Sequence, residues 1–589
     1  MKSYRTICRL PGGDAGTPAI ALFSFPSDII TAKTVEEVIP ALRKIEAAVK
    51  RGMYAAGFIS YEASSAFDDA CEVRSFSSPE HPLPLLRFGI YKSPEPFTLS
   101  GSSGTPDKLE FQPEISEAEY LAQVGKIKRY IYEGDIYQAN FTFRTHASET
   151  PEPYELFLRI SQAHPVPYAS FIEADDFQII SNSPELFLEK NGNILRSDPM
   201  KGTARRSLSA AEDANFAKSL AADSKNRAEN IMITDMVRND MGKICVPGSI
   251  SVDPLCRVDT YQSVHQMISS VHGTLAGNPD FSDILRALFP AASITGAPKI
   301  RAMQIIRETE KSPRGVYTGT IGCIIPDGDF CLSVAIRTLV CSLDRTELGI
   351  GSGIVADSVP GEEWRESLLK SRFASAEQPP EFKILETILY ADGQFVKLDA
   401  RLERMRASQI YFGRPWRECE IRRALDKEVL QEKSANFAKV RLLVDSEGNA
   451  EVEFSTLPVP GWTGEPIRVK ISDERTDSGN LFLYHKTTNR KFYNAKFAEA
   501  RNSGFDEIIF TNEKGEITEG AISNIFVRLN KKWFTPPVSC GLLPGIERAS
   551  LINELEAVEK ILYPSDLSAA EEILVCNSVR GSTAASKIN

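Results

Sequence analysis

Apolar and polar residues follow one another along the chain in patterns that predict helices and strands throughout its length. Residues 224–241 have apolar side chains at helical spacing and predict a helix with one buried stripe. The stripe consists of Met232, Ile233, Met236 and Val237. A second helix is predicted directly after Pro360, because proline suits the first turn of a helix. No internal repeat or heptad array interrupts the alternation.

The clearest boundary in the chain lies at residues 374–380, Ala-Ser-Ala-Glu-Gln-Pro-Pro. Two successive prolines cannot continue a helix, and they stiffen the chain into an extended spacer. The strand-like run Phe382–Leu389 follows directly. Since 589 residues are too many for one hydrophobic core, we predict a first domain over 1–374, a linker over 375–380 and a second domain over 381–589.

The composition is that of an ordinary globular protein, with 42% hydrophobic and 25% charged residues. The net charge of −11 argues against binding to nucleic acids or to anionic membrane surfaces. No stretch approaches the length of a membrane span and no apolar signal follows Met1, so a cytoplasmic protein is expected. The 10 cysteines form no CxxC pair and no zinc-like cluster, which favours reduced thiols.

The segment Pro199-Met200-Lys201-Gly202-Thr203 is the first candidate for chemistry. It follows Glu185 along the chain, and its glycine allows close approach of the backbone to a ligand. Its threonine offers a hydroxyl and an N–H group to an anion. Taken alone, such a segment is more often a surface turn with a solvated lysine.

Carboxylates on the two predicted helices form a second candidate. Glu229 lies on the apolar stripe of the first helix, where a charge needs a cation or a partner such as Arg227. Glu363, Glu366 and Lys370 share one face of the second helix, as surface Glu–Lys pairs also do. Three carboxylates from two helices would suit a hard cation such as Mg²⁺.

Three further segments supply groups that bind anions. The glycines of Gly351-Ser352-Gly353 offer backbone N–H groups, and this segment lacks the context of a dinucleotide fingerprint. Pro298 indicates a helix whose positive end lies near Thr295. Arg337 interrupts the apolar run Leu332–Ile336, so an anionic ligand or an internal carboxylate is expected beside it.

The order of these segments resembles that of the chorismate-utilising enzymes. Seven motifs carry the resemblance: Gly134–Asn140, Ser183–Glu185, Met200–Thr203, Arg227–Asn230, Ile294–Lys299, Ile336–Thr338 and Gly353–Ser358. The resemblance covers about residues 1–372 and is most specific over 130–372. It implies an α+β fold in which a two-sheet sandwich is surrounded by helices.

Within that family, single residues indicate the branch. Isochorismate and salicylate synthases carry a lysine where this chain has Gln138, and anthranilate synthases typically lack a lysine at the position of Lys201. The chain is similar to the aminodeoxychorismate synthase branch. The resemblance implies that Lys201 is the nucleophile, Glu185 the general acid, and Glu229, Glu363 and Glu366 the Mg²⁺ ligands. It assigns the substrate to six residues: Thr203, Thr295, Tyr317, Arg337, Gly353 and Lys370.

One position departs from the pattern of the family. Gln266 stands where many relatives have a histidine next to the substrate, and His265 lies one residue early. The roles of both residues therefore stay open. The leucine-rich tryptophan signature of feedback-regulated anthranilate synthases is also missing near Phe23–Ser27, so amino-acid regulation is not expected.

The second domain resembles the fold-type IV pyridoxal phosphate enzymes, which have two subdomains. Four motifs carry this resemblance over about 381–589: Leu398–Ser408, Tyr484–Arg490, Ile517–Phe526 and Leu542–Arg548. It implies that Lys486 forms the Schiff base and that Glu519 faces the pyridine nitrogen. Arg404, the turn that contains Ile546, and Ser578 would hold the phosphate. Lyases and aminotransferases share these motifs.

The two resemblances together predict a bifunctional enzyme that converts chorismate to 4-aminobenzoate, a folate precursor. An anthranilate synthase-like first domain with an aminotransferase second domain is one alternative, and a non-catalytic regulatory subunit is another. No cysteine lies in the Gly-x-Cys-x-Gly elbow of a glutaminase, so a separate glutamine amidotransferase subunit is expected to supply ammonia. A homodimer through the second domain is also possible on this resemblance.

Overall fold

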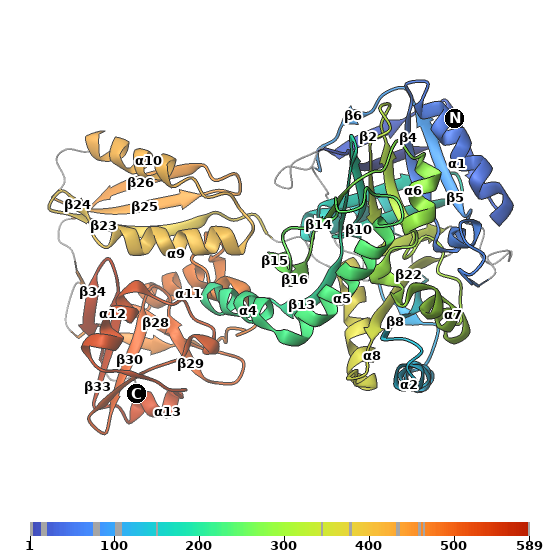
Figure 1. Cartoon of the computed structure of the whole chain (residues 1–589). Helices are drawn as coiled ribbons and strands as arrows, with labels where there is room; N and C mark the ends of the chain where they lie inside the picture. The colour runs from blue at the N-terminus through green and yellow to red at the C-terminus, as the bar shows by residue number, and fades with distance from the viewer. Residues whose placement is uncertain are drawn as a thin grey trace. The chain divides into compact units, whose positions relative to one another are not determined.

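The computed structural model of the chain describes residues 4–12, 20–74, 83–99, 109–148, 151–342, 345–375, 380–431, 436–457, 461–462 and 466–586. The chain divides into two compact units (Figure 1). The first unit comprises residues 1–204 and 218–379, and the second comprises residues 205–217 and 380–589. The predicted linker 375–380 falls at this division, although its residues 376–379 lie outside the described part of the chain.

Two large sheets build the first unit. The 10-stranded sheet runs in the order β18 (Gly296–Ala297), β8 (Gln138–Ala147), β22 (Thr346–Ile354), β21 (Thr338–Ser342), β10 (Phe177–Ser183), β9 (Tyr168–Glu173), β1 (Arg5–Arg9), β2 (Ile20–Ser24) and β6 (Glu95–Pro96), with β7 (Gln112–Pro113) paired to β8. The 9-stranded sheet runs in the order β14 (Ser251–Val252), β17 (Val271–Thr274), β12 (Ile194–Asp198), β11 (Leu186–Asn191), β20 (Phe330–Val334), β19 (Thr320–Ile324), β4 (Tyr54–Ile59), β5 (Leu86–Tyr91) and β3 (Asp28–Ala32).

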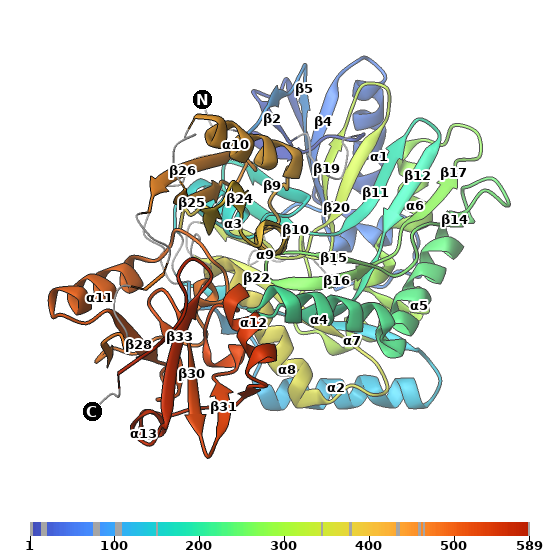
Figure 2. The same cartoon turned by 90° about the vertical axis from the view of Figure 1, so that its left-hand side faces the viewer.

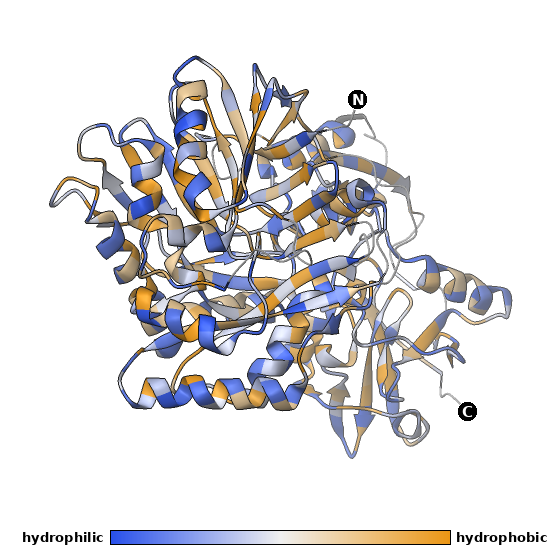
Figure 3. Ribbon diagram, turned by 90° about the vertical axis from the view of Figure 1, so that its right-hand side faces the viewer, coloured by the Kyte–Doolittle hydropathy of each residue, from blue (hydrophilic) through white to orange (hydrophobic). Residues whose placement is uncertain are grey.

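The two sheets face each other across a shared hydrophobic core. Phe23 of β2 and Ile179 of β10 belong to the same buried cluster as Phe58 of β4 and Ile321 of β19. Helices cover the outer faces: α1 (Val35–Val49) and α6 (Phe281–Leu288) on the 9-stranded sheet, and α2 (Glu117–Tyr132) and α3 (Pro153–Ala163) on the 10-stranded sheet. Figure 3 shows orange and blue residues alternating along the helices, as expected where one face packs against a sheet. The predicted sandwich with surrounding helices is confirmed.

The helices expected to carry functional residues are also present. The helix predicted over 224–241 is α5 (Ser224–Met241), and the helix after Pro360 is α8 (Pro360–Leu369), followed by the 3₁₀ turn η3 (Lys370–Ser375). Pro298 is the N-cap of α7 (Lys299–Thr309). A small third sheet, β13 (Met200–Arg205), β16 (Val264–Ile268) and β15 (Arg257–Thr260), holds the segment that contains Lys201.

A buried ion pair ties several of these segments together. Arg314 and Glu310 form a salt bridge of 2.7 Å with side chains only 1% and 4% exposed. The Arg314 guanidinium also donates to the carbonyls of Ile294 and Asn140, at 2.8 and 2.6 Å. Glu310 accepts hydrogen bonds from the N–H and the hydroxyl of Thr142. The end of α7 is therefore fixed to β8 and to the 3₁₀ turn η2 (Ala292–Ile294).

The second unit has two subdomains, as predicted. The first is a 4-stranded sheet, β24 (Gln394–Phe395), β23 (Ile384–Ala391), β25 (Phe437–Val444) and β26 (Ala450–Thr456), packed with α9 (Leu398–Tyr411) and α10 (Glu418–Gln431). The second contains a 3-stranded sheet of β27 (Val469–Ile471), β28 (Glu507–Thr511) and β29 (Ile517–Gly520). Its 5-stranded sheet has the order β32 (Val558–Glu559), β31 (Lys532–Thr535), β30 (Asn524–Leu529), β33 (Glu572–Asn577) and β34 (Gly581–Ala584). Helices α11 (Lys491–Asn502), α12 (Ile546–Glu554) and α13 (Pro564–Ser568) accompany these sheets (Figure 2).

Residues 205–217 differ from the domain division expected from the sequence. The division at 374–380 placed them in the first domain, whereas the structure packs them with the second unit. They include the end of β13 and the beginning of α4 (Ala210–Ala222). In the part of the chain that the structure describes, no helix is both long enough and apolar enough to cross a membrane.

The buried ion pair leads to a prediction about stability. Arg314→Met should lower the free energy of unfolding of the first unit by about 3–5 kcal/mol, because it leaves the carboxylate of Glu310 buried without its cation. Urea titration with hydrogen exchange at β8 measures this energy within the full chain. Arg43→Met, on the exposed face of α1, is the matched control and should cost less than about 0.5 kcal/mol. Equal effects of the two substitutions would contradict the structural role of Arg314.

Candidate active sites

Glu185 lies between strands β10 and β11 and is only 4% exposed. Its backbone is fixed because its carbonyl accepts from the Val334 N–H at 3.0 Å, and its N–H donates to the Ser183 hydroxyl at 3.2 Å. Burial raises the pKa of the Glu185 carboxyl to about 7, although Ser293 and the charge of Lys201 favour the carboxylate. Glu185 can therefore hold a proton at neutral pH.

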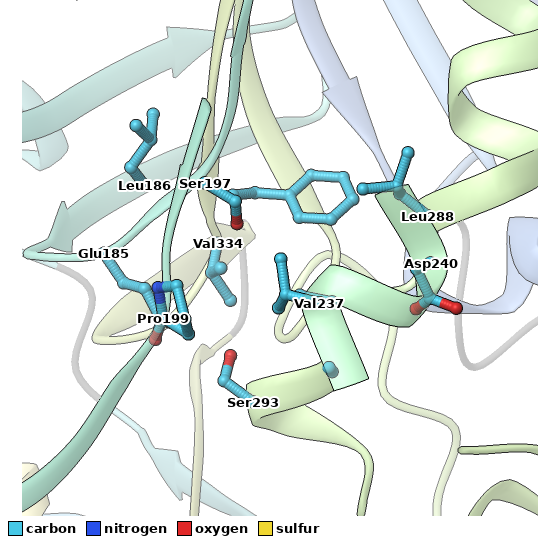
Figure 4. Close-up of a pocket in the computed structure, with 12 residues that line it drawn as sticks. Glu185, Leu186, Ser197, Pro199, Val237, Asp240, Leu288, Ser293 and Val334 are labelled. Carbon is cyan, nitrogen blue, oxygen red and sulfur yellow. The ribbon is translucent and has the colours of Figure 1, made fainter. Parts of the chain in front are cut away.

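A small cavity adjoins Glu185 (Figure 4). Its volume of about 10 Å³ leaves room for roughly one water molecule. Apolar side chains form most of its wall, among them Val237, Leu288 and Val334, while Ser293 and Asp240 add polar atoms. The apolar wall explains why the carboxyl of Glu185 is so poorly solvated.

Lys201 lies in β13 and meets the same region. Burial lowers the pKa of the Lys201 amine, and the positive charge of Lys370 lowers it further. Glu229 and Glu185 oppose this shift, which places both carboxylates within electrostatic reach of the amine. Asn230, next to Glu229 on α5, donates to the Lys201 carbonyl at 3.3 Å and so positions its backbone.

Gly353 is the close neighbour of the Lys201 amine. A Cβ atom at Gly353 would lie 3.0 Å from Lys201 Nζ and 2.6 Å from Gln138 Nε2. Glycine is therefore required here for both side chains to keep their positions. The Gln138 side chain is 1% exposed, and no hydrogen-bond partner of its buried Oε1 occurs in the described part of the chain, so it is an acceptor that a ligand could satisfy.

The three glutamates predicted to bind metal come from α5 and α8. Burial raises the pKa of Glu229, and the charges of Glu363 and Glu366 raise it further. Glu363 accepts a hydrogen bond of 2.7 Å from Ser358, whereas Lys370 forms a 2.9 Å ion pair with Glu366 and lowers its pKa. The charges of Glu363 and Glu366 reach Glu229, but no three His, Cys, Asp or Glu side chains in the described ranges are close enough to hold an ion as they stand.

The two predicted anion-binding cations have different surroundings. Lys370 donates to the Gly351 carbonyl at 2.9 Å in addition to its pair with Glu366. Arg337 does not interrupt a strand as expected, because β20 ends at Val334 and Arg337 occupies the following turn with φ of +49°. Burial lowers its pKa, and no salt bridge to it occurs among the described residues. Its charge is thus available to an anion.

The remaining predicted substrate residues lie on different elements. Thr203 donates to the Gln266 side chain at 3.1 Å, whose amide in turn donates to the Gly202 carbonyl. His265 points elsewhere, since it is buried and its Nδ1 lies 3.0 Å from the Thr260 hydroxyl. The Thr295 hydroxyl donates to carbonyls of its own turn. Burial raises the pKa of Tyr317 to about 12, and the Arg144 guanidinium lies 5.2 Å from the centre of its ring.

In the second unit, Lys486 lies beside a buried carboxylate. Its Nζ is 3.9 Å from Oε2 of Glu386, a residue of β23 that is 1% exposed. Burial lowers the pKa of the Lys486 amine to about 7, and Arg404 contributes to this shift while Glu386 opposes it. Arg404 binds Glu386 through two nitrogens and donates to the Pro544 carbonyl at 3.1 Å.

The other residues predicted to bind the cofactor are Glu519, Ile546 and Ser578. Glu519 of β29 accepts from the Leu543 N–H at 3.2 Å and from Tyr493, and burial raises its pKa to about 8. Ile546 is the first residue of α12, directly after the turn that contains Leu543. The carbonyl of Ser578 accepts from Arg401 at 2.7 Å, and Arg401 also approaches Glu386. Lys486, Arg404 and, through Arg401, the Ser578 carbonyl thus meet at Glu386, whereas Glu519 is linked to them through the turn that contains Leu543 and Pro544.

These surroundings fit pyridoxal phosphate. A cavity of about 370 Å³ opens beside Glu519 and is lined by Tyr493, Leu543 and the cation of Arg490; of the residues predicted to bind the cofactor, only Glu519 lines it. A buried carboxyl with a raised pKa needs a partner such as a protonated pyridine nitrogen. An arginine near the N-terminus of α12 suits a phosphate. Lys486 is partly neutral near pH 7, as an amine that reacts with a carbonyl must be.

Two functional groups were missed from the sequence. Glu386 is the one acidic residue within the largely apolar run 382–389, and that interruption was the available signal. For Arg314, the spacing to Glu310 is that of an ordinary surface ion pair, and the partners that bury it, Asn140 and Ile294, are distant along the chain.

Family models match both halves of the chain. Residues 96–376 match the model described as chorismate binding enzyme, and residues 383–588 match amino-transferase class IV. The solved structure of anthranilate synthase component I from Streptococcus pneumoniae covers 63% of this chain and 90% of its own, with a TM-score of 0.52 and 24% identity. This likeness concerns the fold of the first unit.

Curated relatives carry two names. Aminodeoxychorismate synthase component 1 of Bacillus subtilis is 38% identical over 261 residues, which are 44% of this chain and 56% of the relative. Anthranilate synthase component 1 3 of Haloarcula marismortui is 40% identical over 262 residues, 44% of this chain and 52% of the relative. The chain thus spans about half the length of these relatives, and overall identity does not separate the two activities.

The lowered pKa of Lys486 can be tested by chemical labelling. In the full chain without added cofactor, trace acetic anhydride should acetylate Lys486 with a midpoint near pH 7, because burial disfavours its ammonium form. Lys496 is the control, since Glu474 and Glu499 raise its pKa. Peptide mass spectrometry reports both sites. Labelling of Lys486 only at the higher pH that Lys496 requires would contradict the assignment.

Proposed function

Because the chain joins a domain of the chorismate binding enzyme family to a domain of the amino-transferase class IV family, we propose that it makes 4-aminobenzoate from chorismate in two reactions. The first aminates chorismate at C4, and the second releases pyruvate from the product. The observation that carries the proposal is that Lys201, an amine with lowered pKa, lies within electrostatic reach of Glu185, a carboxyl whose pKa burial raises to about 7.

In the first reaction, Lys201 acts as nucleophile and Glu185 as general acid. The neutral amine of Lys201 adds at C2 of chorismate while Glu185 gives its proton to the C4 hydroxyl, which leaves as water. Ammonia then adds at C4, and the amine of Lys201 leaves from C2. The product is 4-amino-4-deoxychorismate. The ammonium group formed at C4 gives one proton to the Glu185 carboxylate, and Lys201 leaves as a neutral amine, so both residues return to their starting states.

Mg²⁺ is proposed as the countercharge of Glu229, Glu363 and Glu366. The effect of Glu363 and Glu366 on the pKa of Glu229 supports this, because carboxylates that raise one another's pKa are stabilised by a hard cation between them. When bound, the ion would neutralise a carboxylate of the substrate. Glu366 would then exchange part of its pairing with Lys370 for the metal.

Six residues are proposed to hold the substrate. Arg337 and Lys370 supply positive charge, and Gly353 lies beside the Lys201 amine. Thr203, Thr295 and Tyr317 supply hydroxyl groups. The open acceptor of Gln138 suits a substrate hydroxyl better than it suits a base, in agreement with Lys201 rather than water as the attacking group.

The second reaction is proposed for the site around Lys486. Pyridoxal phosphate, when bound, supplies an electron sink for bond cleavage next to an amine. Glu519 would keep the pyridine nitrogen protonated, and Arg404, Ile546 and Ser578 would hold the phosphate. Lys486 can accept and return a proton near pH 7. Elimination of pyruvate is preferred over amino transfer because the preceding domain would make the substrate of that elimination.

A separate glutamine amidotransferase subunit is the proposed source of ammonia. The names of relatives that end in component 1 support a divided enzyme. The chain has no glutaminase elbow, since Gly322-Cys323-Ile324 lies within the buried strand β19 and burial and Cys8 hold the pKa of its thiol above the usual range. A cytoplasmic location and a homodimer through the second domain remain part of the proposal.

An anthranilate synthase-like first reaction is the competing proposal, together with an aminotransferase in the second domain. The comparable identity to an anthranilate synthase component 1 favours keeping it. It differs in product, since anthranilate carries its nitrogen at C2 of the ring. A regulatory subunit without catalysis is the third possibility, and it predicts no turnover at all.

Variants of the two lysines test the proposed function. With chorismate, Mg²⁺, pyridoxal phosphate and ammonium chloride at raised pH, the chain should release 4-aminobenzoate, identified by mass spectrometry, whereas glutamine should not replace ammonium. Lys201→Ala should reduce amination roughly a thousandfold or more while cleavage of supplied 4-amino-4-deoxychorismate persists. Lys486→Ala should reduce cleavage of supplied 4-amino-4-deoxychorismate while amination persists. Lys218→Ala, an exposed control, should change neither. Anthranilate as the product, or absence of turnover, would reject the proposal.

Gly353 provides a second test of the Lys201 assignment. Gly353→Ala should lower the amination rate at least about tenfold, because its methyl group would displace Lys201 Nζ and Gln138 Nε2. Gly361→Ala is the matched control, since a Cβ there meets nothing within 4 Å. Steady-state kinetics and thermal denaturation of both variants separate a local effect from unfolding. Equal amination rates in the two variants would mean that Lys201 Nζ does not take part in amination from its position beside Gly353.

A further inference from the structure

Residues 205–217, which we call the arm, belong to the second unit although the chain on both sides belongs to the first. Arg206 anchors the arm with a side chain that is 7% exposed and paired to Asp213 at 2.9 Å. It donates to the Tyr411 carbonyl at 3.0 Å, and its guanidinium lies 4.2 Å from the centre of the Tyr411 ring. Asp213 also accepts from the Ser207 N–H at 2.8 Å, so the arm is a closed turn.

The next contact is hydrophobic. Leu208 packs against the buried cluster that contains Leu483, Tyr484 and Tyr493. Tyr493 is the residue that donates to Glu519. The arm therefore contributes a side chain to the core beneath the second candidate site.

His485 joins the arm to α9. Its Nε2 lies 3.1 Å from the Leu208 carbonyl, which can only accept, so Nε2 carries the hydrogen. Its Nδ1, 3.0 Å from the Ser408 hydroxyl, is then the acceptor. Burial lowers the pKa of His485 to about 4, which keeps this neutral tautomer at neutral pH. Its ring also lies against Tyr411 and Phe412, with centres 4.4 and 4.8 Å away.

His485 directly precedes Lys486 in the chain. The Lys486 carbonyl accepts from the Leu385 N–H at 2.8 Å, and Thr487 forms a bridge with Ile384. The backbone at Lys486 is thus held by its hydrogen bonds to β23 and by the contacts of the preceding residue, His485. His485 also lines the cavity beside Glu519.

We propose that the arm is a structural part of the second active site, in which Leu208 and Arg206 hold His485 and His485 positions Lys486. The role assigned to Lys486 rests on the proposed function, whereas the positioning of its backbone does not. His485 is a positioning residue, because it touches neither the Lys486 amine nor Glu386 in any contact described above. A segment that follows the predicted nucleophile Lys201 in the chain thereby completes the other site.

Hydrogen exchange of the full chain without cofactor tests the positioning step. The double substitution Arg206→Ala/Leu208→Ala should speed exchange of the peptide that spans 483–487 about tenfold or more. Release of the arm would leave the ring Nε2–H of His485 buried without its acceptor, the carbonyl of residue 208. Asn215→Ala, an exposed change within the arm, is the control and should leave exchange unaltered. Unchanged exchange in the double variant would overturn the proposal.

Two substitutions of His485 test the hydrogen bond itself. His485→Gln keeps an N–H group that can reach the Leu208 carbonyl, whereas His485→Phe keeps the ring but loses both hydrogen bonds. Titration with pyridoxal phosphate, followed by absorbance, should show roughly tenfold weaker binding for the Phe variant and partial recovery for the Gln variant. Equal binding by both variants would overturn the role of His485. If the unaltered chain binds no pyridoxal phosphate, the proposed second reaction is wrong, while hydrogen exchange still decides whether the arm holds this backbone.

Discussion

The geometry of the first unit depends on one buried ion pair, Arg314 with Glu310. A buried pair of this kind gains little net stability, because removing two charges from water offsets most of their attraction. Its effect is on geometry, since a buried guanidinium must place every N–H group against an acceptor. Arg314 meets this need with the carbonyls of Ile294 and Asn140. By holding these two carbonyls, Arg314 fixes the turn before Thr295 and the strand that carries Gln138. The position of these two walls of the first site therefore follows from the need of one guanidinium for hydrogen-bond acceptors.

Loss of water is the constraint that the two candidate sites share. Burial raises the pKa of Glu185 to about 7 and that of Glu519 to about 8, and it lowers the pKa of Lys201 and Lys486. The same physical cause therefore favours the protonated form of both acids and the neutral form of both amines. Neighbouring charges then adjust each group: Lys370 lowers the pKa of Lys201 further, whereas Glu386 raises that of Lys486. Each site thus obtains a proton donor and a reactive amine from ordinary glutamate and lysine side chains, through burial and neighbouring charges alone.

Local patterns in the sequence predicted most of the fold that surrounds these groups. Helical spacing identified α5 to its ends, and Pro360 identified the start of α8, because both signals are contained in consecutive residues. The ordered motifs identified both fold families. The sequence did not indicate that Arg337 leaves its strand, that Glu386 faces Lys486, or that residues 205–217 join the second unit. These features depend on contacts between residues far apart in the chain, which no local periodicity records.

The charges around Lys486 would favour an anionic ligand beside its amine. Glu386 is the one carboxylate that pairs with Arg404 and approaches Arg401 and Lys486 in the contacts described here. A single negative charge among two guanidinium groups and an amine leaves the pocket positive even when Lys486 is neutral. The arginines lower the pKa of Lys486, so an added phosphate would reduce their effect and favour the charged amine. Binding of the anion and the protonation state of Lys486 are therefore coupled, and Glu386 limits this coupling because it already compensates part of the arginine charge.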